Sequence, residues 1–144
     1  MNEETKARIS KKFQERRAEV SKEIYENIEK LSGLRTLKDA QVNILSLRQR
    51  LLEDNYSLME SLTSIRKKYR DDKAAEMENL SKNLQIRYQA NEKNMVIDGK
   101  TSSIKESLEI IENQIAFFTD SIKTIDSIIF GIKARLDIEK TIGL

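Results

Sequence analysis

The chain has 144 residues, of which 35% are charged and 38% hydrophobic, with 26 Lys and Arg against 24 Asp and Glu. The net charge of +2 therefore implies no partner by itself, and a basic site would require local segregation of charge. Proline is absent and glycine occurs only four times, which excludes a turn-rich β architecture. Without Cys or His, the chain lacks thiol chemistry, disulfides and the usual general base at neutral pH.

The sequence offers no membrane span and no catalytic motif. No apolar run approaches the ~20 residues that cross a bilayer, and the start "MNEETKARIS" lacks the apolar region of a signal peptide. The neighbours Asp71 and Asp72 would point about 100° apart on a helix, which makes a poor pair of metal ligands. We therefore expect a cytoplasmic, non-enzymatic protein with no membrane partner, cofactor, metal site or catalytic residue.

The first predicted element is an amphipathic helix over residues 1–33. Apolar residues recur on one helical face, at Ile9, Phe13, Val20, Ile24, Ile28 and Leu31. Gly33 stands where a helix C-cap favours glycine. We expect the helix to end there.

The second predicted element is a long helical region over residues 34–100, uninterrupted from Thr36 to Met95. Apolar residues recur every seven positions, at Leu37, Ile44, Leu51, Leu58 and Ile65. The companion positions of this seam are Gln41, Arg48, Asn55, Leu62 and Tyr69. Polar companions at such positions set register or oligomeric state at some loss of stability. The heptad phase is lost at residues 69–72, where the sequence allows a kink or turn.

A turn is predicted at residues 96–103, "VIDGKTSS", because Asp-Gly favours left-handed backbone conformations. Ser103 and Glu106 have the spacing of a capping box, which predicts that a third helix starts there and occupies residues 101–144. Gly131 inside that helix costs about 1 kcal/mol relative to alanine, so we expect a close backbone approach there.

The third helix carries the clearest pattern of the chain. Its apolar residues alternate between steps of four and three, at Ile104, Leu108, Ile111, Ile115, Phe118, Ile122, Ile125, Ile129, Ile132 and Leu136. Ile110, Phe117, Ile128 and Phe130 widen this surface beyond what a two-stranded coil needs. The sequence thus predicts an all-α protein that assembles into a helical homo-oligomer. The predicted contacts between copies are Ile111, Ile115, Phe118, Ile122, Ile125, Ile129, Ile132 and Leu136.

Basic residues gather at three places, and residues 66–73, "RKKYRDDK", are the densest. On a helix Lys67 and Lys68 lie four before Asp71 and Asp72, so both can be neutralised locally, whereas Arg66 and Arg70 remain. Two further ridges are Arg8, Lys12 and Arg16, and Arg48 with Arg50. Such runs are typical either of a solvated helix face or of a surface that tracks the phosphates of a single strand while bases stack on aromatics. Tyr69 lies on the seam, which favours core packing for its ring.

The stretch "IAFFTDSIKTIDSIIFGIKARLDIEKTIG" resembles the C-terminus of the UvsY-like recombination mediator family of T-even-type phages. That family has an aromatic-bearing helix with an F-x₄-[IL]-K-x-I core followed by F-x-I-K and a glycine near the end. The matching positions here are Phe117, Ile122, Lys123, Ile125, Phe130, Ile132, Lys133 and Gly143. The resemblance covers about 50 residues, and "MVIDGKTSSIKESLEII" resembles the helix start that precedes this pattern in the family.

The resemblance implies a recombination mediator that binds single-stranded DNA and loads a RecA-like recombinase onto strands covered by single-strand-binding protein. It also implies a ring of six or seven copies, in the host-cell cytoplasm if the protein is phage-encoded. The family has one basic, aromatic-containing DNA segment, and "LRQRLLEDNY" and "RKKYR" are the two candidates for it here. The predicted DNA surface is therefore Arg48, Arg50, Arg66, Lys67, Lys68, Tyr69 and Arg70. The alternative is a structural coiled-coil scaffold or adapter without nucleic-acid binding.

Overall fold

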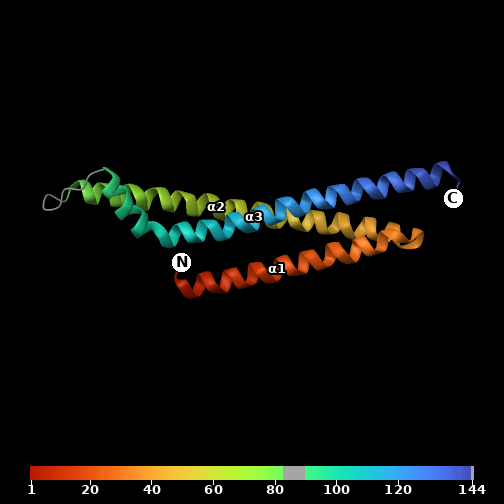
Figure 1. Ribbon diagram of the computed structural model, residues 1–144, viewed down its shortest axis with the longest axis horizontal. Helices are drawn as coiled ribbons and strands as arrows, with labels where there is room; N and C mark the ends of the chain where they lie inside the picture. Colours follow the sequence, from red (N-terminus) through yellow and green to blue (C-terminus); the bar gives the residue numbers. More distant parts are fainter. Residues whose placement is uncertain (83–89, 144) are drawn as a thin grey trace.

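The computed structural model describes residues 1–82 and 90–143. It consists of α1 (Glu3–Glu29), a short 3₁₀ turn η1 (Lys30–Ser32), α2 (Leu34–Lys82) and α3 (Ala90–Thr141). Within the described ranges there is no strand, so the all-α prediction is confirmed. Figure 1 shows an elongated molecule in which α2 and α3 form a long pair and α1 lies along part of it.

Ion pairs fix the directions of the helices. Along α2 and α3 they join Arg48 to Asp126, Arg66 to Glu112 and Glu76 to Lys100, so the partner number falls as the α2 number rises. The two helices are therefore antiparallel. Along α1 and α2 the pairs are Arg16–Asp54 and Glu23–Arg50, which again run in opposite directions. The unbroken helix expected from residue 36 to 95 is thus wrong, because α2 and α3 are two separate helices of opposite direction.

All three helices contribute to one apolar core. Its buried members are Val20, Ile24, Leu37, Ala40, Ile44, Leu47, Leu51, Phe118, Ile125 and Ile132, and Leu62, Leu108 and Ile111 form a second cluster. The eight residues predicted to join copies all lie in or against these two clusters. The α3 seam is therefore packed inside a single chain, and its role between copies stays a prediction.

The companion positions predicted for the first half of α2 are wrong. Ala40 and Leu47 are fully buried, whereas Gln41 and Arg48 are only partly buried. From Leu37 the next residue of a heptad seam is either three positions on, at Ala40, or four positions on, at Gln41. The structure uses the step of three, because it buries the apolar side chain. Beyond Leu51 the step becomes four, so Asn55 and Leu62 are buried as the pattern predicts.

The kink that the sequence allows in α2 and the turn that it predicts in α3 are also absent. α2 continues through residues 69–72, and α3 continues through residues 96–103, where a turn and a domain boundary were expected. Ile97 and Thr101 explain the helix at this point, because both are buried and the Thr101 hydroxyl donates to the Ile97 carbonyl at 2.7 Å. A Cβ at Gly99 or Gly131 would meet nothing within 4 Å, so the close approach expected at Gly131 is wrong. Gly33 follows η1 with φ −109°, an extended rather than left-handed conformation.

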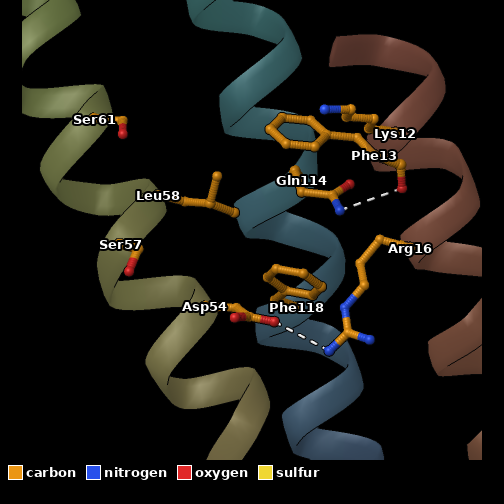
Figure 2. Close-up of a pocket in the computed structure, with 9 residues that line it drawn as sticks. All are labelled: Lys12, Phe13, Arg16, Asp54, Ser57, Leu58, Ser61, Gln114 and Phe118. Atoms are coloured by element: carbon orange, nitrogen blue, oxygen red, sulfur yellow. Dashed lines mark hydrogen bonds and ion pairs between the residues drawn. The ribbon is translucent and has the colours of Figure 1, made fainter. Parts of the chain in front are cut away.

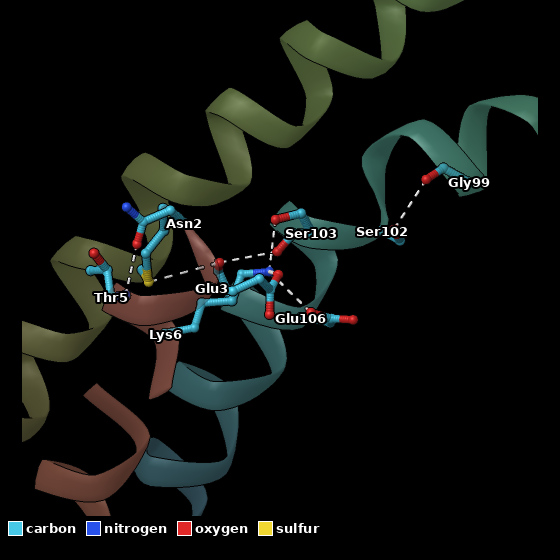
Figure 3. Close-up of polar contacts among 10 residues, drawn as sticks. Asn2, Glu3, Thr5, Lys6, Gly99, Ser102, Ser103 and Glu106 are labelled. Carbon is cyan, nitrogen blue, oxygen red and sulfur yellow. Dashed lines mark hydrogen bonds and ion pairs between the residues drawn. The ribbon is translucent and has the colours of Figure 1, made fainter. Parts of the chain in front are cut away.

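The capping-box pair has a different role from the predicted one (Figure 3). Ser103 and Glu106 lie inside α3, and both accept hydrogen bonds from the Lys6 ammonium, at 2.7 and 3.0 Å. Glu3 accepts a third at 2.9 Å. The Lys6 side chain is only 5% exposed, and its hydrogen bond with Glu3, followed by that with Glu106, raises its pKa although burial opposes the shift. Lys6 thus fixes the start of α1, which Asn2 caps by accepting from the Thr5 amide at 2.7 Å.

Candidate nucleic-acid interface

Three of the arginines predicted to contact DNA are engaged in ion pairs between helices. Arg48 Nε lies 2.6 Å from Asp126 Oδ1, and Arg66 Nη2 lies 3.2 Å from Glu112 Oε1, both across the α2–α3 pair. Arg50 Nη2 lies 3.1 Å from Glu23 Oε2 on α1. These contacts neutralise the three guanidinium groups and give each a structural partner.

The remaining cations of "RKKYR" are free but point in different directions. Lys67, Lys68 and Arg70 are exposed, and none makes a side-chain hydrogen bond or ion pair with any residue in the described ranges. The pairs expected with Asp71 and Asp72 are therefore not formed. Because successive helical residues are about 100° apart, Lys67 and Lys68 project to different sides of α2. The structure does not gather the predicted DNA residues on one face.

The Tyr69 side chain packs against other residues of the protein. Its side chain is partly buried against the Leu62, Leu108 and Ile111 cluster. The Lys73 ammonium lies 5.8 Å from the ring centroid, within cation–π range. This is the core-packing role that its seam position favours, and it leaves little free ring surface for a base.

The N-terminal half of α1 brings a second set of free cations beside α2. Arg8 and Lys12 are exposed and have no partner within the described part of the chain, whereas Arg16 pairs with Asp54. Lys68 is two heptads beyond Asp54, so it projects from the same side of α2, toward α1. The antiparallel register places Arg8 and Lys12 along that side. We call these three cations, Arg8, Lys12 and Lys68, the α1–α2 edge.

A pocket of about 370 Å³ opens along the α1–α2 edge (Figure 2). On one side it is lined by Ser57, Leu58 and Ser61 of α2, and on the other by Lys12, Phe13 and Arg16 of α1. Between them α3 contributes Gln114 and Phe118, and Asp54 of α2 completes the lining. Sequence reasoning missed Ser57, Ser61 and Gln114, because nothing in their local pattern indicates which helices meet.

A polar layer of α1 lies next to the pocket. Arg17 is partly buried and stands on α1 between Phe13 and Val20, two positions with apolar side chains. Arg17 Nη1 donates to Gln114 Oε1 at 2.7 Å, and Gln114 Nε2 donates to the Phe13 carbonyl at 3.3 Å. These hydrogen bonds hold the Gln114 side chain, which lines the pocket, in place.

Comparison with protein-family models, curated proteins and solved structures finds no match for this chain. Among the described residues there is no group of three or more acidic side chains able to hold a metal ion. No helix in the same part of the chain has the length and apolar character to cross a membrane.

Proposed function

We propose that this protein is a recombination mediator that binds single-stranded DNA and promotes loading of a RecA-like recombinase onto strands covered by single-strand-binding protein. The observation that carries the proposal is the α1–α2 edge, where Arg8, Lys12 and Lys68 have no acidic partner among the described residues and Lys12 lines a pocket with aromatic walls. This is the combination that tracks a single-stranded backbone and its bases. The resemblance of the C-terminal stretch to the UvsY-like family supports the same function.

The proposal includes assembly of copies into a ring of six or seven in the cytoplasm of an infected cell. Because the α3 seam is packed inside the chain, contacts between copies would use apolar residues that remain exposed. Phe130 is 75% exposed, and Ile138 and Ile142 are exposed on the same terminal segment. An oligomer multiplies weak phosphate contacts through avidity, so three cations per chain suffice.

The decisive experiment is fluorescence anisotropy of a labelled oligo-dT titrated with protein at several salt concentrations. The test variant is Arg8→Ala/Lys12→Ala/Lys68→Ala. Its matched control is Arg35→Ala/Lys38→Ala/Lys133→Ala, which removes the same charges from exposed cations that also lack partners within the described residues. Each lost phosphate contact on a single strand lowers the magnitude of the salt slope by about 0.7, so the test variant should lose about 2 from the slope per bound chain.

The proposal is supported if the wild type binds with a steep salt slope, the test variant binds weakly and the control binds like the wild type. It fails if the wild type does not bind oligo-dT even at low salt. Equal losses in both variants would assign the binding to net charge rather than to the α1–α2 edge. An Arg66→Ala/Arg70→Ala variant tests the "RKKYR" segment separately.

The alternative is a structural coiled-coil scaffold or adapter. It is favoured by the ion pairs of Arg48, Arg50 and Arg66, which use three of the predicted DNA residues to join helices. A scaffold of this kind would show no salt-dependent binding to oligo-dT.

A further inference from the structure

We infer that the pocket between α1 and α2 receives one base of a bound single strand, while the phosphate of the same nucleotide lies on Lys12. This inference rests on the proposed DNA binding and adds to it a specific site for a nucleobase. The ligand class is a nucleotide: a flat ring with a polar edge and one adjacent negative charge.

The walls of the pocket suit a flat ring. At about 370 Å³ the pocket lies within the roughly 300–1,000 Å³ range of ligand sites in proteins. Phe118 is 2% exposed and forms a fixed apolar wall, with Leu58 and Phe13 beside it. Phe13 is only partly buried, so it is the aromatic side chain of the pocket on which a base can stack, whereas Phe118 closes the back of the pocket.

The polar groups of the pocket suit the edge of a base. Ser57 and Ser61 are four residues apart on α2, and both side chains line the pocket without a hydrogen-bond partner among the described residues. A hydroxyl both donates and accepts, so the two serines can serve any base edge without selecting one. Gln114 is different, since its amide already bonds to Arg17 and to the Phe13 carbonyl. It therefore shapes the wall and leaves recognition to the serines.

The charged side chains around the pocket favour a phosphate at its opening. Arg16 is held by Asp54 at 3.1 Å and by Glu19 at 3.3 Å, so these groups largely compensate one another. Lys12 is the lining residue that keeps a free positive charge, and it lies on the exposed rim of the pocket (Figure 2). A base inside the pocket and its phosphate on Lys12 account for one nucleotide. The phosphates of the neighbouring nucleotides would then lie on Arg8 and Lys68.

The test separates base contacts from phosphate contacts. The probes are a labelled oligo-dT and a strand of equal length in which tetrahydrofuran abasic sites replace the bases, so both carry the same phosphates. The Ser57→Leu/Ser61→Leu variant fills the pocket and keeps every cation. The Ser81→Leu/Ser127→Leu variant makes the same substitutions at exposed serines that do not line the pocket.

Base stacking on an aromatic side chain predicts that the wild type binds oligo-dT about ten-fold or more tightly than the abasic strand. The Ser57→Leu/Ser61→Leu variant should bind both strands equally. Its affinity should equal that of the wild type for the abasic strand, and its salt slope should be unchanged. The control should keep the wild-type preference. A filled variant that retains the preference overturns the pocket site but leaves DNA binding intact, whereas a wild type that binds neither strand overturns both.

A second measurement needs no variant, and it holds even if the filled chain fails to fold. Oligo-dT with iodouracil at one position is bound to the wild type, irradiated, and the cross-linked peptide is identified by mass spectrometry. The pocket site predicts a cross-link at Phe13, the partly exposed aromatic side chain of the pocket. Cross-links confined to Tyr56, Tyr69 or residues outside the pocket would overturn it.

Discussion

Lys6 shows how one side chain can change the role of a local motif. Ser103 and Glu106 have the spacing of a helix start, yet in the folded chain both accept hydrogen bonds from an ammonium nearly a hundred residues away. A buried ammonium requires such partners, because an uncompensated charge in the interior is strongly unfavourable. No local pattern indicates that Lys6 reaches α3, so this contact was beyond prediction from the sequence.

The contacts of Lys6 predict a specific dependence of stability on pH. The pKa of Lys6 is raised above its ordinary 10.5, so its contribution to stability is complete below that pH and is lost as pH rises through the folded-state value. We expect Lys6→Met to melt at a lower temperature than wild type at neutral pH, with a constant difference up to mildly alkaline pH and a shrinking one beyond 10.5. Thermal melts followed by circular dichroism measure this difference. Lys38→Met, at an exposed lysine, is the control, and an equal loss there would contradict the assignment.

At the scale of the helices, the sequence predicts α1 and the seam of α3 well. The strict steps of three and four leave a single face to bury, and the structure packs this face from Leu108 to Leu136 in or against the two clusters. The prediction was wrong where the local sequence fits two conformations, a turn and a continuous helix, about equally well. Asp98-Gly99 resembles a turn, but Ile97 and Thr101 gain burial only if the helix continues. The free cations of the α1–α2 edge could be found along the sequence, whereas their juxtaposition depends on how α1 packs.

Gly99 gives a direct test of the continuous α3. A glycine inside a helix is less favourable than alanine by about 0.5–1 kcal/mol, and a Cβ at this position would meet nothing within 4 Å. Gly99→Ala should therefore increase the free energy of unfolding by about that amount, as measured by urea titration. A destabilised variant would indicate that residues 96–103 form the turn that the sequence first suggests. Gly131→Ala, also in open space inside α3, should behave in the same way.

At the scale of the whole molecule, the burial of the α3 seam determines how stability responds to protein concentration. Ile125 is fully buried within one chain. Ile125→Ala should lower the free energy of unfolding by about 2–5 kcal/mol, the usual range for loss of a core aliphatic group. Because these contacts are internal, the loss should be the same in dilute and concentrated samples. A difference between wild type and variant that grows with protein concentration would instead place the seam between copies.

The polar residues through which α1 packs on the other helices influence the order in which the helices unfold. α2 and α3 hold each other through long apolar rows, whereas the positions by which α1 attaches include Lys6, Arg17 and Asn27. Salt and denaturant weaken charged and apolar contacts to different extents. Amide hydrogens of the first turns of α1 should thus exchange with solvent before those in the centres of α2 and α3. We therefore expect α1 to detach from the α2–α3 pair in a separate, earlier step of unfolding.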